Sequence, residues 1–221
     1  MGVSISQYRQ AIGRFNSVKF VRSTFIVRCN AFPITCLLII IISILLFCSG
    51  TVELNPGPNA NVIPKLKNLT ICHVNIRGLN ISKLRALKTS LCDRFDIITL
   101  SETFLSPTTN DCDLKLPGFH DIIRRDRPTL GGGVAIYVKE SIAFKRIYEC
   151  ECANLEQIWL QLYTNEGKIL ICNLYRPPTF QNFWELIDTN LENVKLRYIN
   201  IKSYLILGDL NADFSDRNGN F

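Results

Sequence analysis

Short apolar runs that end on polar residues recur along the later part of this 221-residue chain. Runs of this kind, bounded by polar and turn-forming residues, predict buried β-strands. We expect six strands, at Leu69–Asn75, Asp96–Leu100, Gly133–Val138, Ile158–Tyr163, Ile169–Leu174 and Tyr204–Leu207. The sequence Asn165-Glu166-Gly167 separates the fourth and fifth strands and predicts a β-hairpin.

Two further segments have the apolar spacing of amphipathic helices. The first is Ser82–Cys92, in which Ser82 is expected to cap the start and three leucines share one face: Leu84, Leu87 and Leu91. The second is Phe180–Leu196, with a face made of Phe183, Leu186, Ile187 and Leu191. The order of the elements predicts an α/β (α+β) fold, a layered mixed β-sheet sandwich flanked by helices, rather than a doubly wound parallel sheet.

Composition divides the chain into four segments. Residues 1–30 are basic and have no clean period, residues 31–48 are hydrophobic, residues 49–67 are a Pro- and Gly-containing linker, and residues 68–221 form the predicted domain. The uncharged run Ala31–Cys48 is 18 residues long, so a helix of this length reaches about 27 Å, close to the thickness of a bilayer core. This run predicts membrane contact, and the alternative is a buried helix or strand.

Charge and the rarer residues exclude several functional classes. The net charge is +6, but residues 58–221 carry 20 basic and 18 acidic side chains, so charge alone does not indicate a polyanion-binding surface there. The nine cysteines are irregularly spaced, which argues against a disulfide framework and for a reducing compartment. Only two histidines are present, His73 and His120, which excludes a histidine-rich zinc site.

Polar side chains follow four of the predicted strands and suggest a common cleft. They are Asn75, Glu102, Tyr175 with Arg176, and Asp209 with Asn211. Strands that end at the same sheet edge would gather these groups where ligand sites of α/β proteins usually lie. Carboxylate and amide oxygens are hard ligands that suit Mg²⁺ or Mn²⁺ rather than zinc, and no small-molecule cofactor is indicated. Tyr175 and Arg176 can hydrogen-bond a phosphate oxygen.

Five motifs, taken in order, resemble the exonuclease–endonuclease–phosphatase superfamily. They are HVNIRGL (His73–Leu79), LSET (Leu100–Thr103), RRDR with GGGVAIYV (Arg124–Val138), NLYRPP (Asn173–Pro178) and LGDLNAD (Leu207–Asp213). The third and fourth are most similar to the endonuclease domains of non-LTR retrotransposons. The resemblance implies a Mg²⁺-dependent (or Mn²⁺-dependent) endonuclease that nicks one DNA strand and leaves a 3′-hydroxyl for reverse transcription.

The resemblance also implies a role for each matching residue. Glu102 would bind the metal, with Asn75 beside it positioning the metal or the phosphate. Tyr175 would hydrogen-bond the scissile phosphate. Asp209 would activate or orient the attacking water, and Asn211 would orient that aspartate and the phosphate.

The later motifs of the family are not found before Phe221, among them a Ser-Asp-His-type terminus with its phosphate-binding histidine. We therefore expect a domain that is incomplete at its C-terminus and impaired in catalysis. Two other functions remain open from the sequence. One is a phosphodiesterase or phosphatase of the same superfamily that acts on a lipid or inositol phosphate. The other is a non-catalytic remnant tethered to a membrane through Ala31–Cys48.

The segment Gly50–Pro58 (GTVELNPGP) resembles the 2A-like peptides at which a ribosome skips one peptide bond. Glu53 and the NPGP sequence match their pattern, whereas Thr51 stands where aspartate is usual. If the chain separates between Gly57 and Pro58, the larger product would be nuclear or cytoplasmic. If it does not separate, the hydrophobic run would carry the whole chain to a membrane. The alternative for NPGP is an ordinary turn in a linker.

In vitro translation of the chain with a C-terminal tag should yield two products as well as the full-length chain. Proline is a conformationally restricted nucleophile, so attack by Pro58 on the Gly57 ester is expected to fail in part of the molecules. The substitution Pro58→Ala should restore a single full-length product. A single full-length band from the original sequence, unchanged by Pro58→Ala, would rule skipping out.

Overall fold

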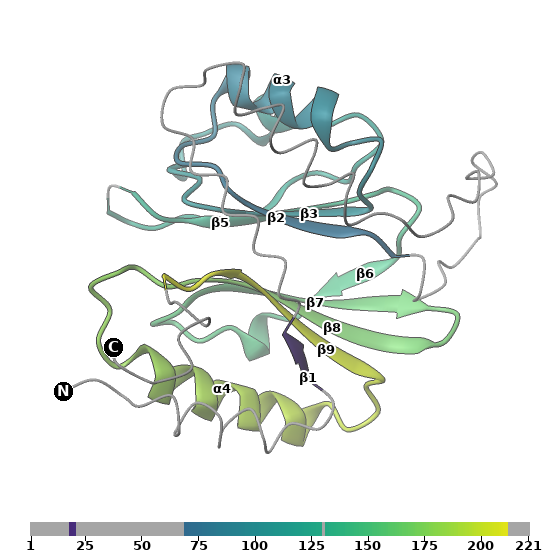
Figure 1. Ribbon diagram of the computed structural model, residues 1–221, viewed down its shortest axis with the longest axis vertical. Coiled ribbons are helices and arrows are strands. Elements are labelled where there is room, and N and C mark those ends of the chain that lie inside the picture. The colour runs from purple at the N-terminus through teal and green to yellow at the C-terminus, as the bar shows by residue number, and fades with distance from the viewer. Residues whose placement is uncertain (1–17, 21–68, 130, 212–221) are drawn as a thin grey trace, which may run out of the picture.

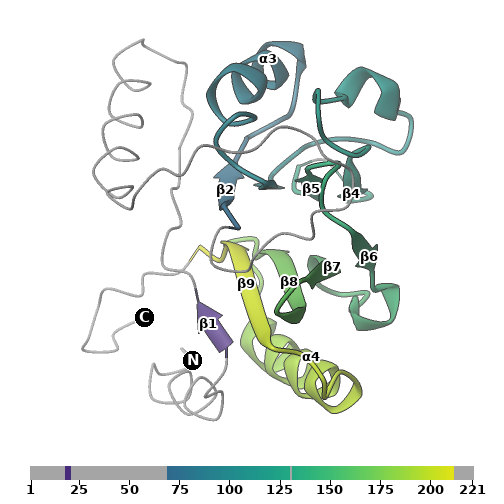
Figure 2. The same cartoon turned by 90° about the vertical axis from the view of Figure 1, so that its right-hand side faces the viewer.

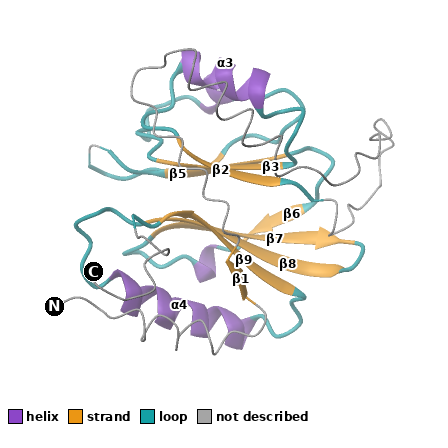
Figure 3. Cartoon of the chain, in the orientation of Figure 1, coloured by secondary structure: helices purple, strands orange, loops and turns teal. Residues whose placement is uncertain are grey.

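The computed structural model describes residues 18–20, 69–129 and 131–211, and these form four layers. Figure 1 shows the order: helix α3 (Ile81–Ser90), a four-stranded sheet, a five-stranded sheet and helix α4 (Phe183–Arg197). The two sheets face one another, and each is covered on its outer face by one helix, as Figure 3 shows by colour. The predicted layered sandwich of mixed sheets flanked by helices is therefore confirmed.

The four-stranded sheet has the order β2-β3-β5-β4. Its strands are β2 (Ile71–Asn75), β3 (Ile97–Ser101), β5 (Val134–Val138) and β4 (Ile123–Arg125). Strands β2 and β3 are parallel, whereas β5 is antiparallel to both of its neighbours. Helix α3 and the turn after it lie between β2 and β3 in the chain. They form the crossover connection that a parallel pair of strands requires.

The five-stranded sheet has the order β1-β9-β8-β7-β6. Its strands are β1 (Val18–Phe20), β9 (Ser203–Asp209), β8 (Gly167–Tyr175), β7 (Glu156–Thr164) and β6 (Phe144–Arg146). Strand β9 is parallel to both β8 and β1, and β1 lies at its side in Figure 2. Strands β7 and β8 form the predicted hairpin, with Asn165 and Glu166 as its two-residue loop.

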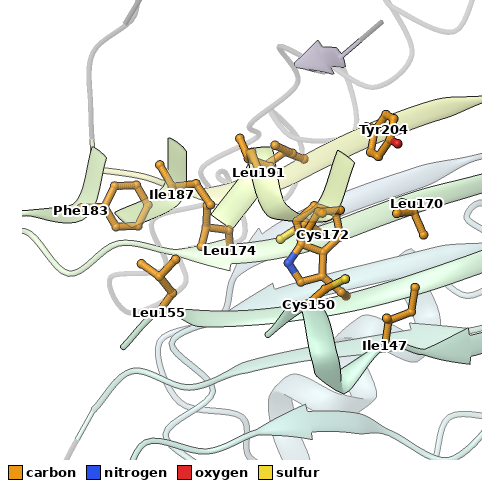
Figure 4. Close-up of a cluster of buried hydrophobic side chains, with 13 residues drawn as sticks. Ile147, Cys150, Leu155, Leu170, Cys172, Leu174, Phe183, Ile187, Leu191 and Tyr204 are labelled. Atoms are coloured by element: carbon orange, nitrogen blue, oxygen red, sulfur yellow. The ribbon is translucent and has the colours of Figure 1, made fainter. Parts of the chain in front are cut away.

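Three apolar clusters separate the layers. One lies between the sheets and contains branched side chains such as Ile97, Ile136 and Ile171. A second lies between α3 and the four-stranded sheet, where Leu87 is buried. The third lies between α4 and the five-stranded sheet, and Figure 4 shows Phe183, Ile187 and Leu191 of the helix against Leu174 and Cys172 of β8. Because both sheet faces are covered, inner strands such as β3 and β5 have nearly continuous apolar sequences rather than alternating ones.

Most of the predicted elements are present, with ends shifted by a few residues, and some details of the prediction were wrong. Asn80, rather than Ser82, caps helix α3, and its side-chain oxygen accepts the Lys83 N–H at 2.9 Å. Short strands β1, β4 and β6 and two 3₁₀ turns, Asp111–Leu114 and Tyr148–Cys150, were not predicted. The six cysteines of the described ranges are free thiols.

The upstream predictions fall outside the residues that the structure describes. These are the basic segment 1–30 apart from β1, the hydrophobic run Ala31–Cys48, and the linker 49–67 with its 2A-like sequence. Within the described ranges, no helix has both the length and the apolar character that crossing a membrane requires.

Gly208 sets the spacing between β9 and β8, so Gly208→Ala should destabilise the protein severely. A Cβ atom there would lie 1.7 Å from the Leu174 carbonyl oxygen, a backbone atom that cannot turn aside. We expect a loss on the order of 3 kcal/mol or more in the free energy of unfolding, measured by urea denaturation. Gly118→Ala is the matched control, because Gly118 also has a positive φ of 78° but no atom within 4 Å of the added carbon. Equal losses in the two variants would contradict the steric explanation.

Candidate active site

The polar residues predicted from the sequence lie where two pairs of parallel strands end. Asn75 is the last residue of β2, and Glu102 directly follows its parallel neighbour β3. In the other sheet, Tyr175 ends β8 and is paired with Asp209, which ends β9. Parallel strands end at the same sheet edge, so each sheet delivers two polar side chains to one place.

The side-chain amide of Asn75 connects the two carboxylates. Its Nδ2 donates to Glu102 Oε1 at 2.9 Å and to Asp209 Oδ2 at 2.7 Å. Asn75 and Asp209 are 134 residues apart in the chain and belong to different sheets. Both are buried, at 3% and 4% exposure. The predicted convergence of Asn75, Glu102 and Asp209 is thus present in the structure.

Tyr175 joins the same cluster from β8. Its hydroxyl donates to Glu102 Oε1 at 3.0 Å, so this one oxygen accepts hydrogen bonds from both Tyr175 and Asn75. Burial, and then the negative charge of Glu102, raise the pKa of the Tyr175 phenol well above its usual range. Tyr175 therefore stays protonated at neutral pH and remains a hydrogen-bond donor.

Asn211 and Arg176 hold the segment that follows β9. The Asn211 backbone N–H donates to Asp209 Oδ1 at 3.1 Å, and its side-chain Nδ2 donates to the Arg176 carbonyl at 2.7 Å. The Arg176 guanidinium donates to the carbonyls of Leu210 and Asn211, each at 3.3 Å, and lies over the ring of Trp184. These contacts give Arg176 a positioning role around Asp209, and its predicted contact with phosphate stays a prediction.

Backbone strain is concentrated at this end of the molecule. In the described ranges, the non-glycine residues with positive φ are Arg77 at 44°, Glu102 at 53°, Phe104 at 54° and Asn211 at 45°. Each lies in one of the segments that follow β2, β3 or β9. A residue other than glycine costs on the order of 1–3 kcal/mol in such a conformation, and strain of this kind is typical of functional sites.

Backbone hydrogen bonds hold the strained segment 102–104 between two glycine-containing loops. Four bonds do this: Gly78 N–H to Glu102 O at 2.7 Å, Leu79 N–H to Thr103 O at 2.7 Å, Phe104 N–H to Gly132 O at 2.9 Å and Thr103 N–H to Gly133 O at 3.2 Å. The NIRGL and GGG sequences therefore fix the backbone that carries the Glu102 carboxylate.

An ion pair that sequence analysis did not identify supports the glycine loop. Glu156 on β7 accepts hydrogen bonds from Arg127 through Oε1, which lies 2.8 Å from the guanidinium Nε. Its other oxygen, Oε2, accepts a hydrogen bond from the Gly133 N–H at 2.7 Å. The guanidinium lies 5.8 Å from the centre of the Tyr175 ring and packs on Gly132, where any side chain would collide with it. Arg127 belongs to the RRDR motif, but no pattern in the sequence marks Glu156 as its partner.

A buried polar layer lies behind the site, between the sheets. His73 Nδ1 lies 3.0 Å from Thr99 Oγ1, and its Nε2 lies 3.3 Å from Ser101 Oγ. Asn173 Nδ2 reaches across from the other sheet to the Leu100 carbonyl at 2.8 Å. Complete burial lowers the pKa of His73 to about 4, so this histidine is neutral at physiological pH. It serves as a hydrogen-bonding core residue.

The donor set fits a hard divalent cation. Glu102 and Asp209 lie within reach of one amide group, and no lysine or arginine of the described ranges forms an ion pair with either carboxylate. Those ranges contain no cluster of three His, Cys, Asp or Glu side chains, which a site built wholly from such ligands would need. Mg²⁺ commonly uses one or two carboxylates and completes its octahedron with water and substrate phosphate.

Comparison with known proteins assigns residues 72–221 to the model of the Endonuclease/Exonuclease/phosphatase family. No curated protein sequence matches the chain. The structure is similar to the endonuclease domain of TRAS1, a telomere-specific non-LTR retrotransposon, at 14% identity and a TM-score of 0.47 over 66% of this chain and 60% of that one. It is also similar to the 3′ phosphatase NExo from Neisseria, at 19% identity and a TM-score of 0.48 over 67% and 60%.

A third similar structure is the mannosyl-6-phosphatase of Bacteroides thetaiotaomicron, with 18% identity and a TM-score of 0.48 over 67% of each chain. The chain thus spans about 60% of the length of the TRAS1 domain and of NExo.

Removing the Glu156 carboxylate should loosen the glycine loop. Glu156→Ala leaves the half-buried Arg127 guanidinium and the Gly133 N–H without their partner, so we expect the free energy of unfolding to fall by about 2–4 kcal/mol. Lys202→Ala, which breaks the more exposed pair between Lys202 and Glu166, is the control and should cost less than about 1 kcal/mol. Chemical denaturation of both variants measures the difference. A loss from Glu156→Ala as small as that of the control would contradict the proposed support.

Proposed function

We propose that this chain, which belongs to the Endonuclease/Exonuclease/phosphatase family, carries the site of a metal-dependent DNA endonuclease. The observation that carries the proposal is the double hydrogen bond of Asn75 to Glu102 and Asp209. It places two carboxylates side by side with an amide, and Tyr175 joins them through Glu102; metal-assisted phosphodiester hydrolysis can use groups of these kinds.

Two features of the cluster suit a phosphate substrate. The donors that hold the carboxylates are uncharged, so the negative charge of the site is left for a cation to balance. Tyr175 and Arg127 are neighbours, with the guanidinium 5.8 Å from the centre of the tyrosine ring. Both can donate hydrogen bonds to the oxygens of a phosphate group.

Each residue then has a definite part in the reaction. The two carboxylate oxygens of Asp209 accept hydrogen bonds from the Asn75 amide and from the Asn211 N–H, and these bonds fix its orientation. Lone pairs remain on both oxygens to accept a proton from water. Tyr175 would turn its single O–H hydrogen bond from Glu102 to a non-bridging phosphate oxygen when substrate binds, and Glu102 together with Asn75 would hold Mg²⁺ or Mn²⁺. When bound, that ion would stabilise the negative charge on the phosphoryl oxygen and on the leaving oxyanion.

The finer proposal is a nick in one DNA strand that leaves a 3′-hydroxyl, as in non-LTR retrotransposition. The support is the sequence itself, where RRDR–GGGVAIYV and NLYRPP resemble the endonucleases of these elements. The position of the first motif also supports this proposal. Arg127 packs on Gly132, and the carbonyls of this glycine loop accept hydrogen bonds from the backbone that follows Glu102. DNA is the proposed partner, and the alternative substrate is a lipid or inositol phosphate.

Nicking of supercoiled plasmid DNA tests this function. The chain should convert supercoiled DNA to the open-circular form in Mg²⁺ or Mn²⁺ but not in EDTA, at the low rate that impaired catalysis implies. Asp209→Asn and Glu102→Gln should each lower the rate by about 10²–10⁴-fold, because each removes a charged group that acts in the transition state. Asp113→Asn, an exposed acid in the 3₁₀ turn Asp111–Leu114, should have the original rate. Hydrolysis of phosphoinositides without any nicking of DNA would favour the alternative.

Metal binding can be measured apart from activity. A ligand that binds only the folded state raises the melting temperature, so saturating Mg²⁺ or Mn²⁺ should stabilise the unsubstituted chain against heat. The stabilisation should be lost in Glu102→Gln, since one of the two carboxylates is gone, and retained in Asp113→Asn. An equal shift in all three proteins would place the cation elsewhere.

A further inference from the structure

Phe104 is a large aromatic residue that is exposed beside the catalytic cluster. It follows Glu102 by two residues, and 50% of its surface is accessible to solvent. It is not part of any of the three apolar clusters that the described residues form. Folding therefore leaves about half of the free-energy gain from burying this ring unused.

The backbone that presents Phe104 is strained and firmly held. Its φ is 54°, in the left-handed region that residues with a side chain rarely adopt. Its N–H donates to the Gly132 carbonyl at 2.9 Å, and the preceding Thr103 is completely buried. The ring is thus directed by a fixed backbone rather than by a flexible loop.

Two glycines leave room for the ring. An added Cβ at Gly78 would lie 3.1 Å from Phe104 Cδ2, and one at Gly131 would lie 3.8 Å from its Cε1. The added Cβ at Gly131 would also lie 3.9 Å from a terminal nitrogen of Arg127. An exposed aromatic surface and a cation therefore both lie close to Gly131, next to the cluster of Glu102 and Tyr175.

We propose that Phe104 stacks on a nucleobase next to the scissile phosphate and so sets the grip of this site on DNA. The inference rests on the proposed endonuclease function and extends it to a residue that contacts the base rather than the phosphate. An aromatic face binds any base by stacking, and the neighbouring Arg127 favours the adjoining phosphate. The strained backbone and the exposed ring of Phe104 lower the stability of the fold, but they leave an aromatic surface free to bind a base.

Steady-state nicking of an oligonucleotide duplex tests the role of the ring. Phe104→Leu keeps an apolar side chain of similar length but removes the aromatic face, so the KM for DNA should rise about 5- to 100-fold while kcat changes much less. Phe104→Trp should keep the original KM, because tryptophan also offers an aromatic face. If Phe104 served only to pack against its neighbours, the larger ring would not fit and the KM would change. Tyr163→Leu removes an aromatic ring at the hairpin end of β7, where Tyr163 pairs with Lys168 and Tyr175 lies at the other end of the strand pair, and is the control with unchanged KM.

A second readout does not depend on turnover. In an Asp209→Asn chain, binding of a duplex with 2-aminopurine beside the nicking position should change the fluorescence of that base. Adding Phe104→Leu should abolish the change and adding Phe104→Trp should retain it. Circular dichroism and thermal melting verify that each variant is folded.

The outcomes separate this inference from the function on which it rests. Normal nicking with an unchanged KM in Phe104→Leu overturns the base-stacking role and leaves the endonuclease standing. Absence of nicking in the unsubstituted chain, together with an aromatic-dependent fluorescence change, overturns the endonuclease proposal and supports base stacking. Absence of both nicking and any fluorescence change overturns both.

Discussion

The amide of Asn75 is the contact on which the arrangement of the site depends. Two carboxylates repel each other in a partly buried place, and a lysine between them would neutralise the charge that a metal ion needs. A neutral amide with two N–H groups holds both Glu102 and Asp209 without cancelling that charge. The site is therefore fixed in position before a cation binds, and the attraction for the cation is retained.

That contact is available only because of the strand directions. β2 and β3 in one sheet and β8 and β9 in the other are parallel pairs, and both pairs end at the same end of the sandwich. The core between the sheets changes along its length, from branched apolar side chains to a polar layer of His73, Thr99, Ser101 and Asn173 behind the site. Hydrogen bonds replace the water that most of these groups lose on burial, and the exception is Asn173 Oδ1, which has no partner.

Sequence reasoning identified the strands and the residues at their ends because both depend on local patterns. An apolar run predicts a strand whatever it packs against, and a polar residue at its end is visible without a structure. The short strand Ile123–Arg125 and the pairing of Glu156 with Arg127 were not predictable in this way. A three-residue edge strand has too few side chains for a period, and an ion pair across 29 residues depends on the packing of two sheets.

The strained backbone at Glu102 is held by contacts from the loops and from the other sheet. Glu102 accepts the hydrogen bond of Asn75 while its φ is 53°, a conformation that costs free energy in an isolated loop. Hydrogen bonds to the glycine loop maintain this conformation, and Glu156 ties that loop to β7 in the other sheet. The geometry of the carboxylates is thus set by contacts that reach across the sandwich. A substitution that shifts one sheet relative to the other would disturb the site without touching a residue that contacts the substrate.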